Sequence, residues 1–497
     1  MKSAILLGTV LLEANLLQVH SFTQGPPLHL RRLVNRREQA SDVFLLASTI
    51  PGTPDSTSIS TSFTVYDKAA DEGKHSRRGE GGGGIINNSA LVAGNMVGAG
   101  VLALPHVAEG PGFLLSSAAM VVVWGYCLSS AIIVAECAGN GRETIQKMAE
   151  ASVGRTAGNL MCASFLASNY LLLVAYISQG ASLLPAVPAL SSFLTSFVGD
   201  IHLAPMVFTT LVGFTSLWSP VRFAEKANTA LVGMIILSFG GLVALGLPHV
   251  DVESLGLTPD ASALPSMLPV AVCALTFQNV VPTVSKNLGG DPMKIRSSIA
   301  IGSGVPLMSY ILWNAVVLGN IGGIDSAGMT SPTDALGATS PLLGVLVAVF
   351  SMSAIVTSFW GASFSLMSEC THLVDAMTSR GSLWDTKEQP PIVDDTRPID
   401  ERTQHDGSAK TAAAAMLVLL PPAIVSTTCT DSFATALQYV GTYVNPFLYG
   451  VAPAFMAYRL RDVENHKIQF PGGTTALAFV AAVTCGYMLW QTFFMTA

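Results

Sequence analysis

Charge is scarce in this chain of 497 residues: Lys, Arg, Asp and Glu together make up 11% of it, and half of the residues are apolar. A soluble domain carries about 25% charged residues. The shortage argues against a water-soluble globular enzyme, a disordered chain and a nucleic-acid-binding protein. The apolar runs are continuous rather than alternating, which disfavours a transmembrane barrel. The composition favours a polytopic α-helical membrane protein embedded in a lipid bilayer.

Motifs for metals and cofactors are missing as well. The seven cysteines lie in or beside apolar segments without a CxxC spacing, as expected for small packing residues. The nine histidines lie in the N-terminal tail, in loops or near the ends of apolar runs. Haem or di-iron chemistry needs paired ligands inside helices, and a channel needs a filter motif. We therefore expect no enzyme, no metal and no cofactor.

Residues 1–82 differ from the rest of the chain. They begin with an apolar stretch, AILLGTVLLEANLLQVH, typical of a secretory signal peptide, and continue with the basic segment TQGPPLHLRRLVNRR and a Ser/Thr-rich region. This two-part pattern resembles the targeting sequence of plastids acquired by secondary endosymbiosis. We predict a targeting and disordered extension that directs the protein to a plastid envelope. The alternative is a signal peptide with a disordered tail, which would fit the plasma membrane or an endomembrane.

The remaining residues, 83–497, form one predicted transmembrane domain. A bilayer-spanning helix needs about 20 predominantly apolar residues. Eleven segments meet or approach this length, at residues 84–109, 112–137, 158–183, 202–218, 227–248, 264–288, 297–320, 342–369, 411–429, 433–457 and 471–495.

The basic residues orient these eleven spans. After the N-terminal tail, all Lys and Arg residues fall in alternate loops. The charged residues of the intervening loops are all Asp or Glu. The positive-inside rule therefore places the N-terminus on the inner side of the membrane and the C-terminus on the outer side. Residues 371–410 are predicted to be a flexible inner loop. Glu136 and Glu369 lie at the inner ends of spans, where we expect water to solvate them.

Two spans are interrupted near their middle. The first reads LVAGNMVGAGVLALP, residues 91–105, and the sixth reads VAVCALTFQNVVPTVSKNLGG, residues 270–290. Glycine, asparagine and proline break a helix, and the freed backbone groups are tolerated at that depth only where protein or a wet cavity satisfies them. Paired breaks five spans apart, in opposite orientations, indicate the binding site of a transporter built from inverted repeats. Close packing of small residues is the alternative.

The breaks suggest a ligand. Free amides centred on residues 97–100, at the positive end of a half-helix, suit a carboxylate. Unpaired carbonyls around residues 274–277 suit an ammonium group or Na⁺. An amino acid zwitterion carries both charges, so we predict an amino acid substrate.

Three motifs carry a resemblance to a known family: GNMVGAGVLALP, FQNVVP and IRSSIAIGSGVPLMSYILWNAVVLGNI. They closely resemble the aromatic amino acid permeases of the tryptophan/tyrosine permease family, over roughly residues 84–495. The resemblance implies an all-α fold of the leucine-transporter type, with a 5+5 inverted repeat and broken helices 1 and 6. It also implies uptake of tryptophan or tyrosine by proton symport. The predicted substrate-binding residues are Gly94, Asn95, Val97, Gly98, Ala99, Gly100, Thr276, Phe277, Gln278 and Asn279.

Four further residues are candidates with open alternatives. Tyr176, near the middle of the third span, could close over a substrate or pack in the core. Ser353 and Thr357 could complete a cation site or bond to their own helix, and the neighbouring Ser358 adds a hydroxyl. Lys226 could snorkel or report proton coupling. Sodium coupling of a neutral amino acid transporter, or a non-transporting sensor on the same fold, remains an alternative to proton symport.

Overall fold

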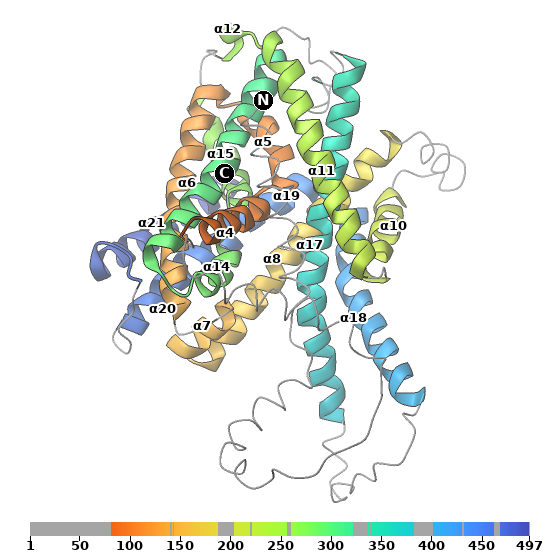
Figure 1. The fold of residues 1–497 in the computed structure, drawn as a ribbon, viewed down its shortest axis with the longest axis vertical. Helices are drawn as coiled ribbons and strands as arrows, with labels where there is room; N and C mark the ends of the chain where they lie inside the picture. The colour runs from red at the N-terminus through yellow and green to blue at the C-terminus, as the bar shows by residue number, and fades with distance from the viewer. Residues whose placement is uncertain are drawn as a thin grey trace, which may run out of the picture.

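The apolar segments form helices in the computed structural model (Figure 1). The structure describes residues 81–139, 142, 144–186, 203–218, 221–255, 260–321, 336, 340–381, 401–429, 432–461 and 468–496. The predicted targeting extension, residues 1–82, lies almost entirely outside these residues. Within them, regular structure is helical throughout, which agrees with the prediction of an all-α fold.

Seven helices are continuous and long enough to cross a bilayer in the described part of the chain. Their bounds are α6 (Gly112–Cys137), α8 (Arg155–Leu183), α11 (Val221–Gly246), α15 (Pro292–Ile321), α17 (Pro341–Gly381), α18 (Glu401–Thr428) and α21 (Gly473–Thr496). By length and composition, eight segments of the described residues qualify as spans when residues 261–287 are included, or nine when a bent pair at residues 84–108 counts as one. The protein is therefore a multi-pass membrane protein.

Two other predicted spans deviate from a long regular helix. The fourth corresponds to α10 (Ala204–Trp218), whose apolar part is shorter than a typical span. The tenth is divided into α19 (Ser432–Tyr439), the π-helical segments η9 (Val440–Val444) and η10 (Phe447–Val451), and α20 (Ala452–Arg461). A π-turn widens a helix and leaves its carbonyls less regularly paired, and such turns are common at functional sites.

The first predicted span is broken as expected. It consists of α4 (Gly81–Met96) and α5 (Gly100–Ala108), which meet at an angle of 61°. Residues outside the span satisfy the backbone at the break. The hydroxyl of Tyr310 on α15 donates to the carbonyl of Met96 at 2.5 Å, and the amide of Ala99 donates to Ser358 Oγ on α17 at 2.9 Å.

The sixth predicted span is broken too. It runs through α13 (Leu264–Ala274), the short η7 (Gln278–Val280) and α14 (Val281–Asn287). Residues 275–277 have no helical assignment, and Phe277 adopts φ −142°. Pro282 lies at the start of α14, where its missing N–H costs no hydrogen bond.

Aromatic side chains pack three of the unbroken helices against one another. Trp313, Phe350 and Phe239, on α15, α17 and α11, form one aromatic cluster with ring centroids 5.4–6.4 Å apart. Large apolar side chains remain exposed on the helices, including Leu237 at 77% and Phe493 at 78%. Such residues favour an apolar surrounding, so a lipid contact explains their exposure.

At the predicted inner end of α6, Glu136 is buried rather than solvated, and the expectation that water reaches it is wrong. Its carboxylate accepts hydrogen bonds from Arg461 Nε at 2.5 Å, from Arg461 Nη2 at 2.7 Å and from the Phe470 amide at 2.8 Å. A buried carboxylate is tolerated because a charged partner and an amide replace its water.

The predicted inner loop at residues 371–410 is shorter in the structure. α17 continues to Gly381 and α18 begins at Glu401, so helix extends into both ends of that loop. In Figure 1 these two helix ends project beyond the other helices. Residues 382–400 lie outside the described part of the chain.

Candidate functional site

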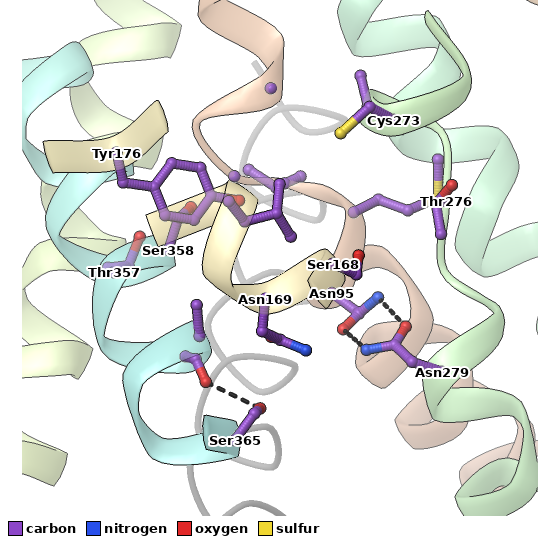
Figure 2. Close-up of a pocket in the computed structure, with 18 of the residues that line it drawn as sticks. Asn95, Ser168, Asn169, Tyr176, Cys273, Thr276, Asn279, Thr357, Ser358 and Ser365 are labelled. Carbon is purple, nitrogen blue, oxygen red and sulfur yellow. Dashed lines mark hydrogen bonds between the residues drawn. The ribbon is translucent and has the colours of Figure 1, made fainter. Parts of the chain in front are cut away.

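A pocket lies where the two broken spans meet α8 and α17 (Figure 2). The tenth predicted span also lines it, through residues in and beside its π-helical part. Its cavity has a volume of about 160 Å³. Among the residues that line it are Gly94, Asn95, Met96, Val97, Gly98, Gly100, Ser168, Asn169, Tyr176, Asn228, Cys273, Ala274, Thr276, Asn279, Thr357, Ser358, Trp360, Ser365 and Asn445. The pocket therefore collects residues from segments up to about 350 positions apart.

Asn95 and Asn279 bridge the two breaks. The Asn95 side-chain amide donates to Asn279 Oδ1 at 2.8 Å, and the Asn279 amide donates to Asn95 Oδ1 at 3.0 Å, as the dashed lines in Figure 2 show. Each side chain uses its donor and its acceptor once in this reciprocal pair. The pair therefore holds the first and sixth predicted spans together at the wall of the pocket.

A second polar chain connects the sixth span to α8. Ser168 Oγ on α8 donates to Asn445 Oδ1 at 3.2 Å, and Asn445 Nδ2 donates to Thr276 Oγ1 at 3.1 Å. Thr276 Oγ1 in turn donates to the carbonyl of Val272 at 2.6 Å. Asn445 lies between the two π-helical segments, so the irregular helix places an amide against the break.

The amide end of α5 faces the hydroxyl groups of α17. Ser358 Oγ accepts from the Ala99 amide, and a Cβ added at Gly98 would lie 2.7 Å from that same oxygen. Glycine is therefore required at position 98 for the close approach of the two elements. The neighbouring Thr357 Oγ1 donates to the carbonyls of Ser353 and Ala354, both at 3.0 Å, in its own helix. Its lone pairs are still able to accept or to coordinate.

Nine of the predicted candidates line the pocket: Gly94, Asn95, Val97, Gly98, Gly100, Tyr176, Thr276, Asn279 and Thr357. Four others do not line it and are buried among neighbouring helices: Ala99, Phe277, Gln278 and Ser353. Lys226 is exposed, and the structure does not bring it to the pocket.

The sequence prediction missed part of the wall. Ser168, Ser365, Asn228 and Cys273 line the pocket, and nothing in their local sequence distinguishes them from packing residues. Two lining residues also carry a buried donor, Asn228 Nδ2 and Trp360 Nε1, for which the described residues provide no acceptor. A buried donor without a partner costs free energy, so these groups favour an acceptor in the pocket.

The remaining wall is apolar. It is formed by Phe165, Leu172, Phe364, Leu437, Tyr449 and the ring of Trp360. Pockets with a few placed polar groups in an apolar, aromatic lining are typical sites for small organic ligands. This site combines hydrogen-bonding groups at the two breaks with an apolar surface that suits a hydrophobic side chain.

Comparison with known proteins points to the same class of ligand. The sequence model of the tryptophan/tyrosine permease family matches residues 83–393 and 399–491. The tyrosine-specific transport system 1 of Haemophilus influenzae is 26% identical over 409 residues, which covers 80% of this chain and 93% of the relative. The tryptophan-specific transport protein of Pseudomonas aeruginosa is 27% identical over 418 residues, covering 80% and 91%. Glutamine transporter 2 of Aliivibrio fischeri is 22% identical over 293 residues, covering 57% and 74%.

The family model covers most of the chain, including both breaks and the whole lining of the pocket. The match agrees with the resemblance that the motifs of the first, sixth and seventh predicted spans suggested. The chain therefore belongs to the tryptophan/tyrosine permease family of amino acid transporters, and it is a transporter rather than an enzyme.

Proposed function

We propose that this protein is a secondary active transporter that moves tryptophan or tyrosine across a membrane by alternating access. The observation that carries the proposal is the meeting of two helix breaks, bridged by Asn95 and Asn279, at the wall of a single pocket. The names of the relatives from Haemophilus influenzae and Pseudomonas aeruginosa support tyrosine and tryptophan as substrates.

The proposed binding mode assigns each end of the amino acid to one break. The carboxylate lies at the start of α5, near Gly98 and Gly100, where amides and the positive end of the helix stabilise negative charge. The ammonium group lies at the carbonyls between α13 and η7, beside Thr276. The aromatic side chain extends along the apolar wall, where burial stabilises it by roughly 25 cal/mol per Å² of apolar area.

Eleven spans in a 5+5 inverted repeat would explain the two breaks. In that arrangement the first and sixth spans are equivalent and antiparallel, so a break in one is repeated in the other. The nine candidate spans, together with α10 and residues 432–461, account for the eleven predicted segments. The positive-inside rule would place the N-terminus on the inner side.

The coupling ion is proposed to be a proton, with Na⁺ as the alternative. Thr357, with the adjacent Ser358 and the carbonyls at the end of α4, forms the candidate cation site. Ser353 contributes its carbonyl to the bonding of Thr357, and Lys226 lies outside the pocket. The candidate cation site therefore rests on Thr357 rather than on Lys226. Its hydroxyl and carbonyl oxygens suit the Na⁺ alternative, because these groups coordinate a cation but do not take up a proton near neutral pH.

Counterflow in proteoliposomes tests this function. The purified protein is reconstituted with unlabelled tryptophan or tyrosine inside, and the entry of labelled substrate is measured while pH and Na⁺ gradients are varied separately. Accumulation that follows the pH gradient is expected. Accumulation that follows only the Na⁺ gradient would replace the proton by sodium, and binding without accumulation would identify a sensor.

The membrane in which the protein resides is proposed from residues 1–82 alone. Their pattern favours the plastid envelope of an alga with a secondary plastid. A fluorescent reporter fused after this segment should enter the plastid of such an alga. Delivery of the reporter to the plasma membrane would contradict this location and leave the transport proposal intact.

A further inference from the structure

Residues 276–279 are divided between two environments. Thr276 and Asn279 line the pocket, whereas the side chains of Phe277 and Gln278 are 0% and 1% exposed and do not line it. Gln278 was predicted as a substrate contact, and the structure instead places its side chain against α6. A polar group as buried as this needs partners for both its oxygen and its nitrogen.

Gln278 has partners at both ends of its amide. Its Oε1 accepts a hydrogen bond from the amide of Phe277 at 2.8 Å. Its Nε2 donates to the carbonyl of Cys127 on α6 at 3.3 Å and lies 3.5 Å from Ser130 Oγ. Since Oε1 faces a donor and Nε2 faces a carbonyl, the surroundings determine the orientation of the amide.

The bond to Phe277 replaces one that the break removes. In an uninterrupted α-helix the Phe277 amide would donate to the carbonyl of Cys273, four residues earlier. Here Cys273 instead accepts a longer bond of 3.4 Å from the amide of Thr276. A buried backbone amide without an acceptor is destabilising, so the Gln278 side chain stabilises the unwound form of this segment by accepting from the Phe277 amide.

The contacts of Gln278 also extend, through Ser130, to the tenth predicted span. Ser130 Oγ donates to the carbonyl of Tyr449, and Tyr449 lines the pocket from the π-helical segment η10. Gln278 therefore stands at the junction of the sixth-span break, α6 and the tenth predicted span.

We propose that Gln278 is the positioning residue of the sixth-span break: its amide holds Phe277 and fastens the unwound segment to α6, so that Thr276 and Asn279 face the substrate. Gln278 itself does not touch the substrate. The proposal rests on the proposed transport of tryptophan or tyrosine. It predicts that residue 278 determines substrate affinity through the backbone rather than through a direct contact.

Gln278→Met tests the proposal because methionine has a similar length and shape but neither donates nor accepts strongly. The loss of about one hydrogen bond should raise the apparent KM for counterflow about tenfold. The maximal rate should stay within about threefold, because a loss of ground-state binding raises KM and leaves the turnover of bound substrate unchanged. Competition by unlabelled substrate, measured at equal pH on the two sides of the membrane, gives the apparent KM and the maximal rate.

Gln491→Met is the matched control. Gln491 is also a buried glutamine that reaches the sixth predicted span, and its Nε2 donates to the carbonyl of Pro265 at 3.0 Å near the start of α13. It has no part in the break. The control should therefore lower thermal stability to a similar degree as Gln278→Met and leave the apparent KM unchanged.

Gln278→His adds a readout that a packing role would not change. Neutral imidazole has one donor and one acceptor, so it can replace the amide, whereas imidazolium has two donors and no acceptor for Phe277. The ratio of KM between this variant and the unmodified protein should stay near one at pH 8. It should rise severalfold at pH values below the imidazole pKa, which is about 6.5 in water.

Three outcomes would overturn the proposal. These are an unchanged KM in Gln278→Met, an equal KM increase in Gln491→Met, and a Gln278→His ratio that does not depend on pH. If Gln278→Met does not fold, the histidine variant alone decides between the proposal and its rejection. A failure of the transport function itself is distinguishable, because the unmodified protein would then show no counterflow.

Discussion

Asn95 and Asn279 exchange two hydrogen bonds, of 2.8 and 3.0 Å, between helix breaks that lie 184 residues apart in the sequence. Neither residue has a carboxylate or an ammonium partner among these contacts, so the pair is neutral and reciprocal. A neutral link between two half-helices holds the breaks together without the cost of burying a charge. This arrangement suits a pocket in which the charges belong to the ligand.

Replacing Asn279 by Ala should weaken substrate binding. The change removes both hydrogen bonds between Asn279 and Asn95, a loss that corresponds to about 1–3 kcal/mol. We expect the apparent KM for counterflow to rise about tenfold, which equals about 1.4 kcal/mol.

A double-mutant cycle provides the control for this prediction. Asn95→Ala should have a similar effect, and Asn95→Ala combined with Asn279→Ala should be little worse than either change alone, because both remove the same interaction. Strictly additive effects of the two single changes would show that the pair is not the functional unit.

Adding a side chain at Gly98 should block transport. A Cβ there would lie 2.7 Å from Ser358 Oγ, and overpacking of this kind costs about 1–3 kcal/mol. We expect Gly98→Ala to reduce counterflow strongly and Gly98→Val to abolish it, while the folded protein remains in the membrane. Size-exclusion chromatography in detergent verifies the folding.

Ser358→Ala in the Gly98→Ala background should restore part of the activity, because it removes the oxygen that the new Cβ meets. As a further control, Gly125→Ala on α6 should be neutral, since no described atom lies within 4 Å of a Cβ at that position. Full activity of Gly98→Val would contradict both the tight fit and the carboxylate assignment.

Breaking the ion pair at the predicted inner end of α6 should destabilise the protein. Glu136→Leu leaves the Arg461 guanidinium, which is 11% exposed, without its charged partner. Removing one member of a buried pair costs about 3–5 kcal/mol, so we expect a clearly lower melting temperature in a thermal-shift measurement.

Glu136→Leu combined with Arg461→Met should recover much of this loss, because an apolar pair of similar size needs no charge compensation. If the double variant is as unstable as the single one, the contribution of Glu136 comes from its bond to the Phe470 amide rather than from Arg461.

Gly441→Ala should destabilise the tenth predicted span. A Cβ at Gly441 in η9 would collide with the carbonyl of Pro269 in α13, and a backbone atom cannot move aside as a side chain can. We expect a lower melting temperature, corresponding to about 1–3 kcal/mol. Gly486→Ala on α21, where no described atom lies within 4 Å, is the matched control and should not change it.

The breaks in the first and sixth spans could be predicted because local chemistry causes them. Gly98 and Gly100 lack a side chain, and Pro282 cannot continue an α-helix without a lost bond. Nine of the candidate residues line the pocket. The same reasoning did not find Ser168 or Asn228, because a serine or asparagine on a regular helix has no local signal that separates a pocket wall from a packed interface.

The amino-acid sequence by itself determined that this chain crosses a bilayer in many helices and where two of those helices break. These properties depend on local hydropathy and backbone preference, which need no distant partner. Only the tertiary structure decided which side chains face the pocket. Gln278 and Asn279 are adjacent in the sequence, yet Asn279 turns toward Asn95 and Gln278 turns toward Cys127. Inside a membrane protein, buried polar groups must find partners on other segments, so the fold selects the direction of each side chain.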